Sequence, residues 1–133
     1  MRALALDYGS ARCGAALSDP TGTLATPIEP VERPGSKAGL ERIAGLVRDR
    51  DVETVVVGLP LTLGGEDSAQ TSEAREFASR VAEAVAPVPV VLHDERLTTA
   101  QARRTGGRAS EDSRAAAHLL EAWLATRPDA ADR

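Results

Sequence analysis

Three acidic residues lie where the sequence predicts that strands or helices begin or end. Asp7 closes the apolar run RALALD, and Gly9 follows it by two positions. Glu95 ends the run VVLHDE, and Asp112 opens a helical pattern. Each acid alone has an ordinary explanation, as a turn residue, an ion-pair partner or a first-turn helix acid. Together they indicate a site, because converging carboxylates without a partner repel one another and raise each other's pKa.

A divalent cation relieves such repulsion. Ligand sets made only of oxygen favour Mg²⁺ or Mn²⁺ over zinc, and the one cysteine and two histidines lack zinc-type spacing. A pair of such ions suits in-line displacement at a phosphodiester, since one activates water and the other stabilises the leaving oxygen. We therefore predict that Asp7, Glu95 and Asp112 are the metal-binding and catalytic residues, with Mg²⁺ or Mn²⁺ as cofactor.

The expected neighbours of these acids follow from periodicity. Helical steps place Asp112 on the core-facing stripe of its helix, which needs a partner because desolvating a lone carboxylate is costly. Strand alternation puts Glu95 on the same face as Val91 and His93. If the first and fifth strands are neighbours and the last helix covers them, the three carboxylates converge.

The rest of the chain predicts the frame that holds these residues. Apolar runs and helical spacing alternate along the sequence and predict strands at 2–7, 13–18, 23–32, 53–61 and 90–95, and helices at about 37–49, 74–85 and 110–126. Pro27 and Pro30 confine the third strand to a sheet edge. The order β-β-β-α-β-α-β-α predicts an α/β fold with one mixed five-stranded sheet. We expect a single domain over 1–126 and a frayed tail over 127–133.

Composition limits the partners. The chain has 133 residues with a net charge of −4, so phosphate binding must come from a local cluster. Arginines from Arg96 to Arg114 flank two of the three acids and could supply it. Aromatic residues make up only 2% of the chain, which disfavours base stacking. No apolar stretch reaches the length of a membrane span, and the N-terminus lacks a secretory pattern, so we expect a cytoplasmic protein with no membrane partner.

Four blocks of sequence resemble the YqgF family of the RNase H-like superfamily, described as Holliday junction resolvases and as pre-16S rRNA nucleases. The blocks are LALDYGSARCGAALSD (4–19), VVVGLPLTLGGEDS (55–68), HDERLTT (93–99) and DSRAAAHLLEAWL (112–124). The resemblance implies an RNase H-like fold and a metal-dependent nuclease that processes the 5′ end of pre-16S rRNA. It carries the family's metal-binding acids onto Asp7, Glu95 and Asp112. It also implies substrate contacts from Gly9, Arg12, Gly58, Arg96, Thr98 and Thr99.

The sequence leaves alternatives open for the partner, the assembly and the function. The resemblance favours RNA as the partner, with structured DNA possible and a monomer or weak homodimer as the assembly. A Holliday junction resolvase and a non-catalytic nucleic-acid-binding module in ribosome assembly or transcription are alternatives. The hairpin DYGSARCGAALSD also resembles the phosphate-binding hairpin of actin and sugar kinases, but those proteins bind ATP between two such domains and this chain has room for one.

Overall fold

The computed structural model describes residues 2–60, 68–94 and 111–126. Its first three strands, β1 (Ala3–Asp7), β2 (Arg12–Ser18) and β3 (Ala25–Glu32), form an antiparallel meander, as the short spacings predict. The remaining strands are β4 (Thr54–Leu59) and β5 (Val90–Asp94), and both join the sheet in parallel. The sheet order is β3-β2-β1-β4-β5, which places the proline-containing β3 at an edge as expected.

One expectation about the sheet is wrong. Strands β1 and β5 are not neighbours, because β4 lies between them and pairs with both. Every residue of β4 is buried, and a strand that is apolar on both faces is most stable in the middle of a covered sheet. Strand β5 is only partly buried and takes the edge, with Leu92 40% exposed.

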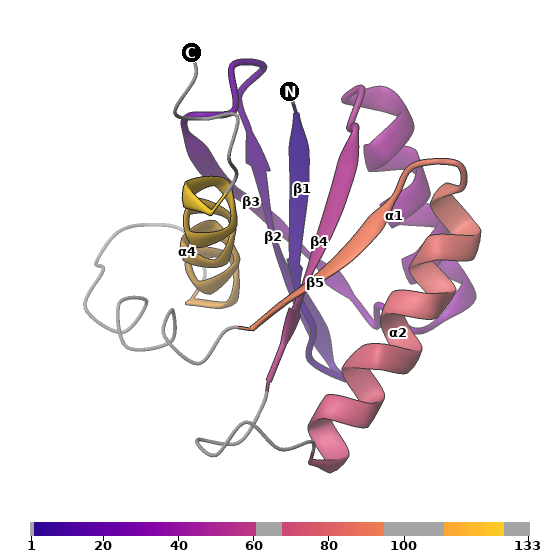
Figure 1. The fold of residues 1–133 in the computed structure, drawn as a ribbon. Helices are drawn as coiled ribbons and strands as arrows, with labels where there is room; N and C mark the ends of the chain where they lie inside the picture. Colours follow the sequence, from indigo (N-terminus) through magenta and orange to yellow (C-terminus); the bar gives the residue numbers. More distant parts are fainter. Residues whose placement is uncertain (1, 61–67, 95–110, 127–133) are drawn as a thin grey trace.

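Helices cover both faces of the sheet (Figure 1). Helices α1 (Lys37–Asp49) and α2 (Ala69–Val85) pack together on one face, and α4 (Glu111–Ala125) lies on the other. Ser36 caps α1 by accepting from the Gly39 N–H, and Ser68 caps α2 in a capping box with Thr71. These bounds agree with the predicted helices, except that α2 begins five residues earlier than its apolar spacing indicates.

The two faces have different cores. The α1/α2 face is filled by larger side chains, among them Leu4, Leu6, Val55, Val57 and Phe77. The α4 face is lined mainly by alanines and by leucines of α4 itself, including Ala3, Ala5, Ala16, Ala116 and Leu120. Small side chains on the sheet let the α4 backbone come close, which matters for the site. Within the described residues, no helix is both long enough and apolar enough to span a membrane.

Candidate active site

Asp7 is the last residue of β1, and its side chain lies on the α4 face of the sheet. Ala3 and Ala5 pack in the core beneath α4, and alternation puts Asp7 on that same face. Gly9 allows the chain to turn directly after it, because a Cβ on Gly9 would come within 2.6 Å of the Arg12 carbonyl oxygen. Tyr8, by contrast, turns to the other face and packs its ring 4.7 Å from that of Phe77. Burial, helped by the charge of Glu73, raises the pKa of the Tyr8 phenol.

Asp112 reaches the same place from the first turn of α4. Gly14 of β2 is the pairing partner of Asp7, and a Cβ on Gly14 would overlap the backbone carbonyl of Asp112. The α4 backbone therefore touches β2 at the strand position directly beside Asp7. The backbone of Asp112 is thus brought beside Asp7 across one glycine, although the two acids are about a hundred residues apart in the sequence. The predicted convergence of three carboxylates also involves Glu95, which lies outside the described residues, and the role of Gly14 was not predicted.

The predicted burial of Asp112 is wrong in detail. Its side chain is 47% exposed, and Ser113 occupies the centre of the buried stripe, with only 1% exposed. The reason is the close contact at Gly14, which brings the helix backbone against the sheet and leaves the Asp112 carboxylate at the margin. A carboxylate at that margin stays accessible to an ion and to a substrate, which a core position would prevent.

Ser113 fixes the first turn of α4 to the sheet. Its hydroxyl donates to the Ile28 carbonyl at 2.6 Å and accepts from the Ala15 N–H at 3.4 Å. Ala15 and Ile28 are paired residues of β2 and β3, next to a shift in the strand register. The hydroxyl thus satisfies a buried donor and a buried acceptor at an irregularity of the ladder. Its position on the helical stripe was the signal in the sequence, since a buried serine requires such partners.

Arg12 lies beside the acids. Its Nε is 3.8 Å from Oδ2 of Asp112, and the two side chains are 54% and 47% exposed. An ion pair this long and this exposed contributes at most about 1 kcal/mol. So weak a pair leaves the Arg12 guanidinium accessible to other partners, and its role in substrate binding stays a prediction.

Gly58 on β4 and His93 on β5 lie at the same level of the sheet as Asp7 on β1 and Gly14 on β2. Val57 pairs with Leu6, so Gly58 stands one step further, beside Asp7, and His93 is the partner of Gly58. Val56 and Val91 contact the α4 core, so alternation places Gly58 and His93 on the α4 face. Gly58 was predicted to offer its backbone to a phosphate. The structure places it inside β4, next to Asp7.

His93 lies about 10 Å from Asp7, which is two strand spacings along the sheet. Burial lowers the pKa of its imidazole, and the neighbouring charge of Asp94 opposes that effect only in part. The shared face of Val91 and His93 was predicted and is as expected.

The remaining predicted site residues, Glu95, Arg96, Thr98 and Thr99, lie outside the described residues. Within the described ranges no three acidic, histidine or cysteine side chains gather closely enough to hold a metal ion. The described part of the site therefore supplies two carboxylates, Asp7 and Asp112. Carboxylate oxygens at an exposed margin are suitable ligands for Mg²⁺ or Mn²⁺.

The architecture belongs to a known class. It is similar to Thermus thermophilus RuvC in complex with a Holliday junction, with a TM-score of 0.63 at 16% identity, covering 93% of this chain and 94% of that one. A second Thermus thermophilus RuvC structure matches with a TM-score of 0.59 at 17% identity. These likenesses show the fold, and the predicted RNase H-like class is confirmed.

The family follows from the sequence comparisons. The RuvX family model, described as Holliday junction resolvase, matches residues 1–126, and the chain belongs to this family. Relatives from Mycobacterium ulcerans and Mycobacterium tuberculosis (strain ATCC 25618 / H37Rv) are 43% and 44% identical over 135 residues. Each alignment covers 95% of this chain and 79% of the relative, and both relatives are named "Putative pre-16S rRNA nuclease". The predicted membership of the YqgF family, which is the RuvX family, is confirmed.

Proposed function

We propose that this chain is a divalent-metal-dependent nuclease that hydrolyses phosphodiester bonds at the 5′ end of pre-16S rRNA. The observation that carries the proposal is the meeting of Asp7 and Asp112 across Gly14, at an accessible margin of the sheet. The names of the mycobacterial relatives support the substrate. The RuvC fold supports nucleic acid as the partner.

The chain's own residues would act as follows. Asp7, Asp112 and Glu95 would hold Mg²⁺ or Mn²⁺, which supplies activation of water and stabilisation of the leaving oxygen when bound. Gly58, next to Asp7 on β4, would offer its backbone to a phosphate. Arg12 would orient that phosphate, and Arg96 with Thr98 and Thr99 would contact the adjoining backbone. Gly9 keeps the turn after Asp7 tight enough for Arg12 to reach the site.

The direct test is cleavage by the wild-type chain and the Glu95→Gln variant. The substrates are an RNA containing the 5′ flank of pre-16S rRNA and a four-way DNA junction, each with Mg²⁺ or Mn²⁺. We expect metal-dependent cleavage of the RNA by the wild type and none by Glu95→Gln, with unchanged thermal unfolding. Equal cleavage by both proteins would reject the assignment of Glu95.

A second candidate function is resolution of Holliday junctions. It is favoured by the description of the family model and by the fold of RuvC, which was solved with a junction bound. Cleavage of the four-way junction in preference to the RNA, by the wild type only, would select it. Cleavage of neither substrate, with metal-independent binding to both, would instead select the non-catalytic binding module.

A further inference from the structure

Arg33 has a backbone conformation that is unusual for its residue type. Its φ is 44°, in the left-handed region that arginine rarely adopts. The other described non-glycine residue in this region is Asp51, a type that adopts it more readily. A glycine at position 33 would adopt this conformation without the steric cost. An arginine held in this conformation at a local steric cost is a candidate for a functional side chain.

The surrounding structure holds Arg33 firmly. Its N–H donates to the Ala11 carbonyl at 2.9 Å, and its carbonyl accepts from the Ser36 N–H at 3.0 Å and the Ser36 hydroxyl at 2.7 Å. Gly39 packs so closely on the Arg33 carbonyl that a Cβ there would overlap it. The backbone is thus fixed on both sides, and the direction in which the side chain leaves it is fixed too.

The Arg33 side chain is exposed and has no polar partner among the described residues. Among the described residues, its guanidinium makes no ion pair or hydrogen bond, whereas Arg12, Arg42, Arg48 and Arg80 all have acidic partners. A fixed backbone with a free cation is a suitable arrangement for an anion that comes from outside the chain.

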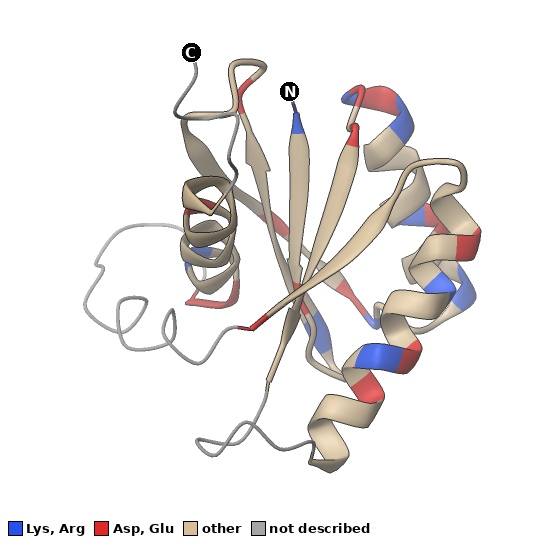
Figure 2. Ribbon diagram, in the orientation of Figure 1, with Lys and Arg blue, Asp and Glu red and all other residues tan. Residues whose placement is uncertain are grey.

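The position of Arg33 connects it to the active site. Ala11, which accepts its N–H, belongs to the turn between Asp7 and Arg12, and Glu32, which precedes it, pairs with Arg12. Neighbouring strands are about 5 Å apart, so Arg33 lies next to Arg12 along the end of the sheet where β1 stops. Figure 2 shows basic and acidic residues of the described segments along the ribbon.

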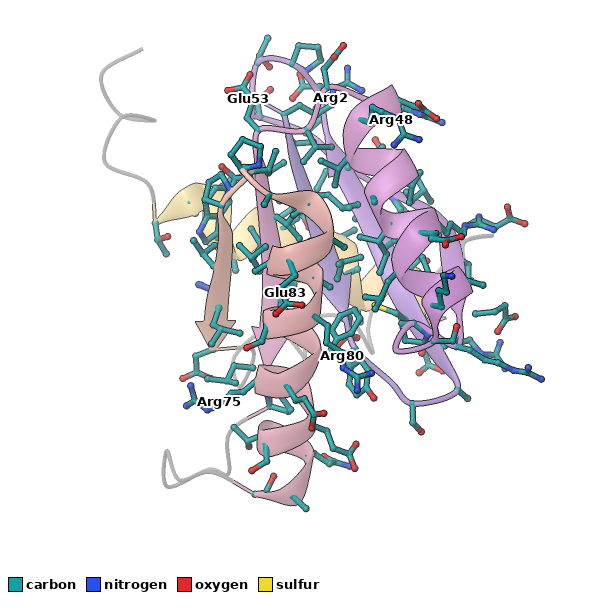
Figure 3. All side chains as sticks on the ribbon, turned by 90° about the vertical axis from the view of Figure 1, so that its right-hand side faces the viewer. Arg2, Arg48, Glu53, Arg75, Arg80 and Glu83 are labelled. Carbon is teal, nitrogen blue, oxygen red and sulfur yellow. The ribbon has the colours of Figure 1, made fainter. Side chains whose placement is uncertain are left out.

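The opposite end of the sheet carries a different set of charged residues. There Arg2 and Arg50 share a shallow depression with Asp49, Asp51 and Glu53, so acids outnumber bases. Figure 3 shows Arg2, Arg48 and Glu53 together at that end. Acids are present at both ends, so the distinguishing feature of the end with Arg12 and Arg33 is that its arginines lie beside Asp7 and Asp112.

We propose that Arg33 and Arg12 form a phosphate-binding track that leads the nucleic acid backbone to the acids at Asp7 and Asp112. Arg12 contacts the phosphate nearest the site, and Arg33 contacts the next one along the strand. The inference rests on the proposed function as a nuclease, and it adds a substrate-binding residue outside the motifs that resemble the family's. The contacts are to phosphates only, so the track serves RNA and DNA alike.

The test compares Arg33→Gly with Arg50→Ala, a matched loss of one exposed arginine at the other end of the sheet. Binding is measured by fluorescence anisotropy over a series of salt concentrations, with Ca²⁺ in place of Mg²⁺. The probes are a labelled RNA hairpin from the 5′ flank of pre-16S rRNA and a labelled four-way DNA junction. Thermal unfolding of each variant is followed in parallel.

We expect Arg33→Gly to weaken binding about fivefold to tenfold near 0.1 M salt and to reduce the slope of log K against log salt by about one. Its midpoint of unfolding should equal or exceed that of the wild type, because glycine relieves the positive φ. Arg50→Ala should bind like the wild type. Unchanged affinity and slope for Arg33→Gly would reject the phosphate-binding track and leave the proposed nuclease function standing. Failure of the wild type to bind either probe would overturn the proposed function with it.

Discussion

The two faces of the sheet are covered in different ways. The α1/α2 face is packed with large apolar side chains, whereas the sheet offers mainly alanines to α4 on the other face. Large side chains bury the most area and contribute the most hydrophobic free energy. Small ones let a helix backbone reach the sheet, as α4 does at Gly14. We infer that the first face mainly stabilises the fold and that the second mainly positions the two acids.

Replacement of Phe77 should have the largest effect on stability. Phe77 is 3% exposed and packs on Tyr8 in the α1/α2 core. Phe77→Ala should lower the free energy of unfolding by about 3–5 kcal/mol, measured by urea denaturation, because it leaves a cavity. The protein that remains folded should bind Mn²⁺ as the wild type does. Weakened Mn²⁺ binding in that folded fraction would contradict the division between the faces.

A methyl group at Gly14 should damage both stability and the site. The new Cβ would overlap the backbone carbonyl of Asp112. Because a Cβ has a fixed position on its own backbone, no side-chain rotation can relieve this overlap. We expect Gly14→Ala to cost about 3 kcal/mol and to weaken Mn²⁺ binding at the same time. Gly45→Ala in α1 is the matched control. Its Cβ would lie 3.7 Å from the nearest atom, so the better helix propensity of alanine should stabilise the fold by up to about 1 kcal/mol.

Loss of the Ser113 hydroxyl should have an intermediate effect. Ser113→Ala leaves the Ala15 N–H and the Ile28 carbonyl without this partner, at a cost of about 1–2 kcal/mol in unfolding free energy. Ser79→Ala, at an exposed position of α2, serves as the comparison and should be close to neutral. Equal stability of the two variants would show that the α4 face does not depend on this contact.

The smallest expected effect lies in the β2–β3 turn, far from the site. Hydrogen bonds from the Thr21 hydroxyl and from the Leu24 and Thr23 N–H groups hold the pKa of Asp19 well below its usual range. A carboxyl whose pKa is lower in the folded state stabilises the fold above its unfolded pKa, about 4, and loses that contribution as the pH falls. Urea denaturation at pH 3 and pH 6 should therefore show a smaller pH dependence for Asp19→Asn than for the wild type. An unchanged dependence would reject this assignment.

Much of the fold could be predicted from the sequence because its signals are local. The prolines of β3, the apolar run of β4 and the spacing in α1 each identify their element, and the structure agrees. The position of β4 between β1 and β5 was missed, because strand order depends on tertiary packing that no single segment encodes.

The site could be predicted in part for the same reason. Asp7 and Asp112 stood out as acids at the ends of elements, and the structure brings them together. Gly14 and Ser113 were missed, since their roles exist only when α4 lies against β2. Arg33 was missed as well, because a positive φ at an arginine leaves no trace in the pattern of polar and apolar residues.

The central claim is that Asp7 and Asp112 meet across Gly14 to share one cation. Titration calorimetry with Mn²⁺ tests it on the wild type, on Asp7→Asn, on Asp112→Asn and on the double variant. If the acids share an ion, each single change should weaken binding strongly, and the double variant should be little worse than either. Independent losses that add in the double variant, or binding equal to that of the wild type in all three variants, would contradict a shared site.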